Sequence, residues 1–420
     1  MKSFLFNASL TVSWLLLFQY CQRNSFQDPS SVFYDPSRAY TRNYSATRES
    51  EADRFLERAA STPATAEKPW IYQGRNMDME NAKKLGGRRI CIGIPSVRRQ
   101  REQFTERTIA SLVDTLSPEE RKLINLKVLL ADDTPQNHPA WQQPWLHNVA
   151  DEVLVYGEEG DESQTDERQR ITTISRQLFP GDGRNKRVQL DYANVIRACR
   201  ATEADYFVLI EDDVIASRDW FQRLHRSLGE TETQNTGADW LYLRLFYSET
   251  YMGWNSEEWP VYLRNSLLIY TAIILTVLLV RCRSAAVKPM KLSDVIKFNK
   301  CAIVQVTFWV AAYVALYFMA GRLLVNPYRM GVHEMPRYGC CAQGLAMPHR
   351  HLEKLEQRLR EPPHELPGDS FVDMVADQEG LKKWAMVPSV LQHVGVRGSS
   401  EQGGYYKTTW NFGFEKGLLE

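Results

Sequence analysis

The sequence has no excess of charge of either sign, because 51 Lys and Arg residues balance 51 Asp and Glu residues. A balanced chain lacks the strongly basic surface of a nucleic-acid binder, so we expect no nucleic-acid partner. Cysteine is also scarce, with seven residues in 420, which is too few for a disulfide scaffold. No Walker motif, no G-x-G-x-x-G and no G-x-S-x-G nucleophile elbow occurs, so the protein classes that depend on these motifs have no support here.

The apolar residues gather in three runs, Phe4–Tyr20, Leu267–Val280 and Cys301–Ala320. The third run has about the 20 residues that a helix needs to cross the hydrocarbon of a bilayer. No charged residue interrupts the second and third runs, which favours a membrane hairpin over two buried helices of a soluble core. No small-x-small cleavage site clearly follows the first run, which favours an uncleaved signal-anchor over a signal peptide.

The link Arg281–Lys300 carries six Lys or Arg residues against a single acid, Asp294. Short basic links stay in the cytosol, so both hairpin ends and most of the chain should be lumenal. In that compartment Asn43 of the sequon Asn43-Tyr44-Ser45 is a candidate glycosylation site. Four cysteines would also be lumenal, and their three pairings remain open: Cys91, Cys199, Cys340 and Cys341.

Apolar runs of strand type alternate with amphipathic helices between residues 89 and 246, after a polar stem with one helix at Glu49–Ala60. The predicted strands are Arg89–Ile94, Leu126–Ala131, Glu152–Tyr156, Asp205–Ile210 and Trp240–Phe246, and the predicted helices are Gln103–Leu116 and Gln189–Ala201. This order predicts an α/β fold with a mainly parallel sheet flanked by helices. Ligands bind at the carboxyl ends of such strands, where Ser96, Asp133 and Glu211–Asp213 should gather.

Three adjacent acids, Glu211, Asp212 and Asp213, follow the fourth predicted strand without a spacer. Their mutual repulsion would be relieved by a divalent cation, and oxygen ligands suit Mg²⁺ or Mn²⁺. The alternative is a solvated turn whose acids cap a helix at Ala216–Leu228, since Asp is favoured at helix starts. Placement at a strand end of an α/β sheet favours the metal site.

The run FVLIEDDVI (Phe207–Ile215), preceded by LDYANVIRAC (Leu190–Cys199), resembles the GT-A glycosyltransferases. In that family an Asp-x-Asp-like element holds Mn²⁺ against the diphosphate of a sugar nucleotide. The first acid here is Glu211, so Asp213 is the first-choice ligand. Further segments resemble other parts of the fold. They are Ile92–Arg99, similar to the first strand and loop that cradle the nucleotide; Arg337–Leu355, similar to a later strand and helix; Leu366–Asp377, similar to the acid-bearing loop and helix near the acceptor, with Asp369 in the loop; and Val387–Ser400, similar to the C-terminal segment of N-acetylglucosaminyltransferases of the complex N-glycan type.

A GT-A domain split by a membrane hairpin behind an N-terminal anchor resembles the Golgi GPI-anchor N-acetylgalactosamine transferases. The resemblance divides the chain into a signal-anchor (1–22), a lumenal stem (23–85), a first catalytic part (86–261), the hairpin with its cytosolic loop (262–325) and a second catalytic part (326–420). It implies a multi-pass Golgi membrane enzyme that transfers GalNAc from UDP-GalNAc, with inversion, to a mannose of a GPI-anchored glycolipid or protein. The hairpin would then hold the active edge near the bilayer, or would simply anchor and sort the protein.

The resemblance also implies roles for single residues. The metal, Mn²⁺ or Mg²⁺, would be held by Asp213 with Glu211, Asp212 and His393. The general base would be Asp369, with Asp373 second, and a helix cap is the alternative for either. The UDP-sugar would be contacted by Ser96, Arg99, Asp133 and Asp191, for which surface salt bridges are the alternative.

Two other functions stay open at this point. One is a related GT-A transferase that uses another UDP-sugar or an N-glycan acceptor. The other is a non-catalytic membrane adaptor that keeps a transferase fold.

Overall fold

The computed structural model describes residues 2–62, 87–100, 102–157, 165–166, 170–175, 182–235, 237–287, 292–335, 341–395 and 409–417. They divide into two compact units, each interrupted in the sequence by the other. The helical unit comprises Met1–Tyr40 and Glu249–Tyr328. The sheet-bearing unit comprises Thr41–Ser248 and Arg329–Glu420.

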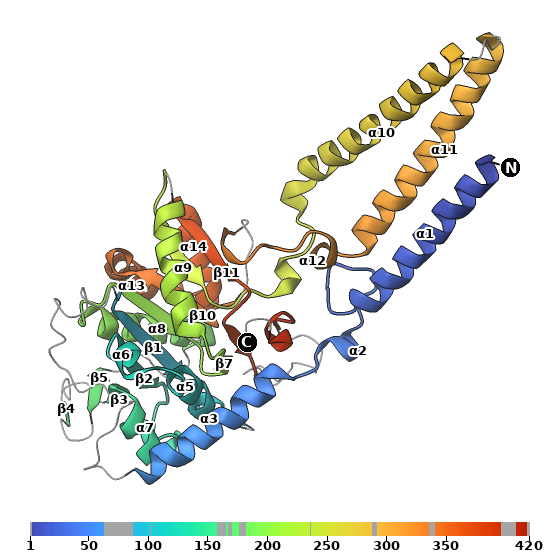
Figure 1. Ribbon diagram of the computed structural model, residues 1–420. Helices are drawn as coiled ribbons and strands as arrows, with labels where there is room; N and C mark the ends of the chain where they lie inside the picture. Colours follow the sequence, from blue (N-terminus) through green and yellow to red (C-terminus); the bar gives the residue numbers. More distant parts are fainter. Residues whose placement is uncertain are drawn as a thin grey trace. The chain divides into compact units, whose positions relative to one another are not determined.

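A ten-stranded sheet in the order β4-β5-β3-β2-β1-β6-β10-β8-β11-β9 forms the centre of the described sheet-bearing unit (Figure 1). The strands are β1 (Ile90–Ser96), β2 (Ile124–Leu130), β3 (Glu152–Gly157), β4 (Thr165–Asp166), β5 (Ile171–Ser175), β6 (Tyr206–Ile210), β8 (Trp240–Arg244), β9 (Gly331–Glu334), β10 (Gly344–Pro348) and β11 (Lys382–Val387). The run β5-β3-β2-β1-β6 is parallel throughout, and β8 pairs in parallel with β11. Strand β10 is antiparallel to both of its neighbours. The predicted mainly parallel sheet is therefore confirmed.

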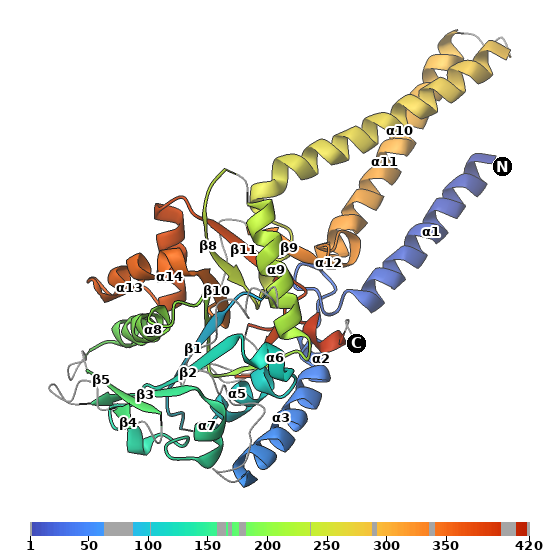
Figure 2. The same cartoon turned by 60° about the vertical axis from the view of Figure 1, so that its left-hand side comes forward.

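Helices cover both faces of the sheet (Figures 1 and 2). They are α3 (Tyr44–Ser61), α5 (Thr105–Val113), α6 (Pro118–Arg121), α7 (Pro144–Val149), α8 (Arg184–Arg200), α9 (Trp220–Gln234), α13 (Leu352–Arg360) and α14 (Gly368–Gln378). Successive side chains of β1 point to opposite faces of the sheet. On one face, Ile92 packs in the core that includes Ile109 of α5. A Cβ on the next residue, Gly93, would lie 2.9 Å from the Cβ atom of Val195 in α8. Glycine at this position thus lets α8 lie close against the sheet.

The disulfide Cys91–Cys199 joins β1 to α8 on that same face. This settles one of the pairings that the sequence left open. Cys341 is disulfide-bonded as well. Cys340 lies outside the described residues.

Helix α3 begins at Tyr44, five residues before the predicted start, and belongs to the sheet-bearing unit. Its apolar residues Ala52 and Phe55 lie in the main core. Arg48 is fully buried and donates hydrogen bonds to both carboxylate oxygens of Asp114, at 2.7 and 2.9 Å. The sequence analysis placed this segment in the stem, whereas the structure makes it part of the sheet-bearing unit.

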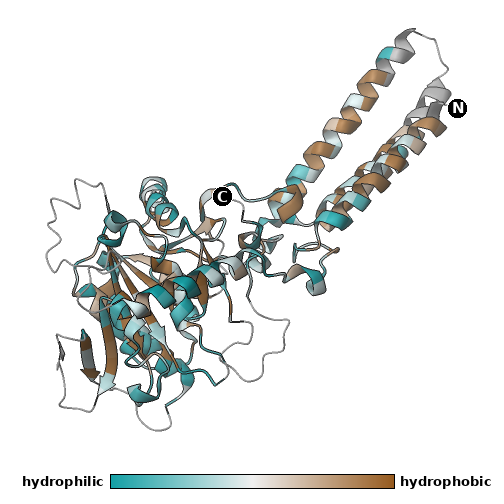
Figure 3. Cartoon of the chain, turned by 60° about the horizontal axis from the view of Figure 1, so that its bottom comes forward, coloured by the Kyte–Doolittle hydropathy of each residue, from teal (hydrophilic) through white to brown (hydrophobic). Residues whose placement is uncertain are grey.

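Among its described residues, the helical unit contains three helices that are long and apolar enough to cross a membrane, over Phe4–Asn24, Glu249–Val280 and Lys300–Met319. They correspond to α1 (Lys2–Asn24), α10 (Trp259–Val287) and α11 (Leu292–Met319), and the short helices α2 (Pro36–Ala39) and α12 (Arg322–Val325) accompany them. Almost none of their apolar side chains is buried, and they are predominantly brown in Figure 3. Two buried helices of a soluble core are therefore excluded, and the chain is a membrane protein.

Candidate active site

The acidic cluster, defined as Glu211, Asp212 and Asp213, follows the fully buried strand β6 directly. After it comes β7 (Val214–Ala216), which pairs antiparallel with β12 (Leu391–His393). Helix α9 begins only at Trp220, so the alternative in which these acids cap a helix starting at Ala216 is wrong. The solvated-turn alternative fails too, because Asp212 and Asp213 are only 4% and 5% exposed.

Asp212 is held by groups from the neighbouring strand β1. The register pairs Gly93 with Leu209, so Ser96 and Asp212 each lie three residues beyond paired positions. The Ser96 hydroxyl donates to Asp212 Oδ2 at 2.8 Å, and Arg99 Nη2 donates to Oδ1 at 2.5 Å. The predicted gathering of Ser96 with the acidic cluster is therefore present in the structure, and Arg99, which was predicted only as a contact of the UDP-sugar, bonds to the cluster as well.

A histidine that the sequence analysis did not single out supports this arrangement. His138 Nδ1 accepts from the backbone N–H of Ala140 at 3.1 Å, which leaves Nε2 to donate to Ser96 Oγ at 3.1 Å. Burial lowers the pKa of His138 to about 4, so the ring is neutral near pH 7. His138 thereby directs the Ser96 proton toward Asp212. Its position shortly after strand β2 was the available sequence signal.

Asp213 pairs with His393, the last residue of β12. Asp213 Oδ2 lies 3.2 Å from His393 Nε2 and 3.0 Å from Arg99 Nη2. Burial alone would raise the pKa of Asp213, but His393 and Arg99 outweigh burial and lower it. Burial would conversely lower the pKa of His393, and the Asp213 carboxylate raises it instead. Residues 180 positions apart thus form one charged site.

The residues around Asp213 fit a divalent cation. Asp213 Oδ1 and His393 Nδ1 are buried and have no hydrogen-bond partner among the described residues. Buried carboxylate oxygens are rarely left without a partner unless an ion or water satisfies them. No set of three or more His, Cys, Asp or Glu side chains in the described part of the chain could hold a metal. Two protein ligands nevertheless suit Mg²⁺-like ions, which are commonly completed by substrate phosphates.

Glycine at position 395 is required beside this pair. A Cβ there would lie 2.4 Å from Asp213 Oδ2 and 3.1 Å from His393 Nε2. Any side chain would therefore displace the carboxylate.

Glu211 contacts Tyr192 of α8, whose hydroxyl lies 3.4 Å from Glu211 Oε1. Burial, followed by the charge of Asp213, raises the pKa of Glu211 to about 8. A carboxyl group that holds its proton is a poorer cation ligand than an ionised one. This agrees with the choice of Asp213 over Glu211.

The two predicted base candidates differ in their surroundings. Both oxygens of Asp373 accept from Arg244 Nη2, at 3.0 and 3.2 Å, and the Tyr242 hydroxyl donates to it as well. Asp369 is in the first turn of α14 rather than in the predicted loop, and accepts from the backbone N–H of Ser370 at 2.7 Å. Asp373 is thus occupied by Arg244 and Tyr242, which leaves Asp369 the better candidate. Arg244, a lone charge within an apolar strand, was a sequence signal that the analysis missed.

The remaining predicted contacts have partners of their own. Asp133 makes an exposed ion pair with Arg187 at 3.5 Å, as its surface alternative proposes. Asp191 accepts from the buried Tyr156 hydroxyl at 2.5 Å, and burial raises the pKa of Asp191 to about 7. Asn43, the predicted glycosylation site, is exposed at the start of α3.

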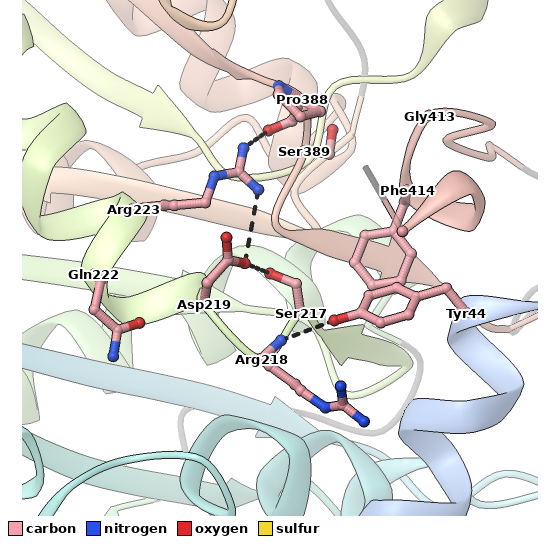
Figure 4. Close-up of a pocket in the computed structure, with 11 residues that line it drawn as sticks. Tyr44, Ser217, Arg218, Asp219, Gln222, Arg223, Pro388, Ser389, Gly413 and Phe414 are labelled. Atoms are coloured by element: carbon pink, nitrogen blue, oxygen red, sulfur yellow. Dashed lines mark hydrogen bonds and ion pairs between the residues drawn. The ribbon is translucent and has the colours of Figure 1, made fainter. Parts of the chain in front are cut away.

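A separate cavity of about 320 Å³ lies at the other end of the β7–β12 pair, beside Ser217 and Ser389 (Figure 4). Its polar lining groups bond to one another: Ser217 donates to Asp219 at 2.8 Å, and Arg223 donates to the carbonyl of Pro388. Its one lining carboxylate has no histidine beside it in the cavity wall. The acidic cluster is therefore the stronger candidate for the chemistry.

The chain is similar in sequence to known N-acetylglucosaminyltransferases. The chain is 26% identical over 188 residues to alpha-1,3-mannosyl-glycoprotein 4-beta-N-acetylglucosaminyltransferase C of Macaca fascicularis, covering 44% of this chain and 38% of the relative. It is 24% identical over 234 residues to the B form of Mus musculus, covering 47% and 39%. The chain thus spans less than two fifths of the length of these relatives.

The α/β sheet, its acidic edge and these relatives define the class of the protein, which is a glycosyltransferase. The family follows from a match over residues 90–392 to "GPI-N-acetylgalactosamine transferase PGAP4". The chain belongs to this family. A solved structure, glucosyl-3-phosphoglycerate synthase from Mycobacterium tuberculosis with Mn²⁺, uridine diphosphate and phosphoglyceric acid, is 17% identical with a TM-score of 0.18, over 41% of this chain and 49% of that one.

Proposed function

We propose that this protein transfers GalNAc from UDP-GalNAc to a mannose of the GPI-anchor core, with inversion and with a divalent metal. The observation that carries this proposal is the buried Asp213–His393 pair, with an unpartnered carboxylate oxygen, in a member of this family. We place the enzyme in the Golgi membrane as a multi-pass protein with the sheet-bearing unit in the lumen. The basic link Arg281–Lys300 supports this orientation.

Asp213, together with His393 in its neutral form, would hold Mn²⁺ or Mg²⁺, and the metal would supply positive charge that stabilises the departing diphosphate. Arg99 already bridges Asp212 and Asp213, and its guanidinium is placed to donate to phosphate oxygens as well. Ser96 and His138 fix the Asp212 carboxylate, which in turn orients Arg99. The site is therefore organised before a substrate arrives.

Asp369 is our candidate for the base that takes the proton from the acceptor hydroxyl, and Asp373 is the second candidate. Asp373 has a clear supporting role in either case, because it bonds Arg244 and Tyr242 and so ties α14 to β8. Asp133 and Asp191 remain proposed nucleoside contacts.

Purified full-length protein tests the proposal with four donors, UDP-GalNAc, UDP-GlcNAc, UDP-galactose and UDP-glucose, and a GPI glycan acceptor. We expect transfer from UDP-GalNAc that stops when EDTA is added and returns with Mn²⁺. Asp213→Asn should lower kcat/KM by about 100-fold or more, the usual scale for removing a transition-state electrostatic contact. Asp205→Asn, at the other end of strand β6 and 51% exposed, is the matched control.

Each alternative has its own outcome in this experiment. Preference for UDP-GlcNAc and an N-glycan acceptor would replace the proposed donor and acceptor. Full cellular function of Asp213→Asn would instead support a non-catalytic adaptor.

A further inference from the structure

A cavity of about 670 Å³ lies in the helical unit, between α10 and α11 and beside the start of α1. Its body is apolar and includes Ile273 and Val277 of α10 and Val310 and Val314 of α11. The two helices approach each other at the linked ends and separate toward their other ends (Figures 1 and 2). We call this cavity the groove; it is of the size of small-molecule sites, roughly 300–1,000 Å³.

The groove is long enough for a hydrocarbon chain. Its wall on α11 runs from Gln305 to Phe318, which is about 20 Å at 1.5 Å per residue. Half of a bilayer's hydrocarbon core is about 15 Å thick. A chain that enters from one leaflet therefore finds apolar wall along its full length.

Polar residues line the end where the helices are apart, among them Glu258, Arg322 and Asn326. Arg322 is 8% exposed, and its Nη1 lies 3.4 Å from Glu258 Oε2. Arg322 Nε is buried without a hydrogen-bond partner among the described residues. Because Arg322 lines the groove, its guanidinium suits a phosphate there, and the adjacent Glu258 carboxylate suits an amine close to that phosphate.

The free energy of a hydrocarbon chain changes little when the chain moves from the bilayer into an apolar groove, because lipid tails are as apolar as the side chains. The apolar walls therefore cannot select one lipid over another, and selection has to come from Arg322 and Glu258. From this geometry we infer that the groove holds the hydrocarbon anchor of the acceptor, a phosphate-linked glycolipid whose phosphate lies at Arg322. The inference rests on the proposed function and adds a recognition site for the lipid half of the substrate.

The test uses the full-length protein in phosphatidylcholine nanodiscs and two acceptors with the same GPI glycan, one with its phospholipid anchor and one from which a phospholipase has removed it. The readout is the ratio of kcat/KM for the anchored over the anchor-free acceptor. Val310→Trp fills the groove, and Val304→Trp places the same bulk on the same helix at a side chain that is 70% exposed. We expect Val310→Trp to lower the ratio about tenfold, equal to about 1.4 kcal/mol, and Val304→Trp to leave it within about twofold.

An unchanged ratio in Val310→Trp would overturn the inference and would mean that bulk phospholipid fills the groove. Ile273→Trp, from the opposite wall, repeats the test if Val310→Trp does not fold. Arg322→Gln should lower the ratio as well, and an unchanged ratio there would also count against the proposed phosphate contact. If the wild-type protein transferred sugar to neither acceptor, both the proposed function and the inferred lipid site would be overturned. If it transferred sugar to both acceptors and Val310→Trp left the ratio of kcat/KM unchanged, only the inferred lipid site would be overturned.

Discussion

Replacing Arg48 by Met tests whether α3 is an integral part of the sheet-bearing unit. Arg48 is fully buried and donates to Asp114 and to the backbone carbonyls of Ala216 and Ser111, at 2.9 and 3.2 Å. Ala216 is the last residue of β7, the strand that follows Asp213. Helix α3 is thus tied to the strand that carries the acidic cluster.

The expected loss of stability is large because Asp114 would remain behind as an unpaired buried carboxylate. Its side chain is 6% exposed, and removing one partner of a buried ion pair costs about 3–5 kcal/mol. Each kcal/mol lowers Tm by about 2–4 °C in domains of 150–250 residues, so Arg48→Met should lower Tm by roughly 10 °C. The double variant Arg48→Met/Asp114→Leu should recover much of this loss, since neither charge is then left alone.

A matched control joins the same two helices at the surface. Arg107 of α5 pairs with Asp53 of α3 at 2.8 Å, but the two side chains are 32% and 44% exposed. Exposed pairs contribute about 0–1 kcal/mol, so Arg107→Met should lower Tm by about 4 °C at most. Thermal unfolding of both purified variants, followed by tryptophan fluorescence, makes the comparison. Equal Tm changes in the two variants would refute the reasoning.

Three further predictions concern the site and the core. Gly395→Ala should lower transfer by about 100-fold with little change in Tm, because it would displace the Asp213 carboxylate, our proposed metal ligand, and a shift of about 1 Å costs that much. Near-normal activity would contradict the crowding around Asp213. Burial raises the pKa of Asp191 to about 7, so the folded state keeps a proton that the unfolded state loses above about pH 4. The Tm of the wild-type protein should therefore fall as pH rises from 4 to 7, and Asp191→Asn should flatten this slope. An equally steep slope in the variant would be evidence against the raised pKa of Asp191. Replacing Cys91 and Cys199 by Ser opens a loop of 108 residues, so stability measured in urea should fall by about 4–5 kcal/mol, and a change under 1 kcal/mol would disprove a stabilising role.

Strands β1, β2, β3, β6 and β8 were predictable because each is a short apolar run bounded by polar residues. The parallel strands β5 and β11 were not predicted. Strand β6 differs from its predicted bounds by one residue, and β3 extends one residue further than expected. Strand β7 was missed because three residues give no periodic signal, and its partner β12 lies beyond the hairpin. The burial of α3 was missed because its polar residues outnumber its apolar ones, which is typical of an exposed stem.

The site was predictable where residues follow strands, and less so where they depend on tertiary packing. Ser96 and Asp212 could be placed together because β1 and β6 were both predicted and both end at the same edge. His138 was missed because only the packing of the loop after β2 brings it to Ser96. Arg244 and Tyr242 bond to Asp373 because α14 and β8 come together in the folded protein. No local sequence pattern predicts that contact.

The positions of Asp213 and His393 in the sequence have a consequence for membrane insertion of the protein. Asp213 precedes the hairpin and His393 follows it, yet the two side chains are in contact. A polypeptide that threaded only one hairpin span would carry these residues on opposite sides of the membrane, and β12 could not reach β7. On the proposed multi-pass topology, insertion of both hairpin spans would therefore be a precondition of transfer, and a copy with only one span inserted would be inactive.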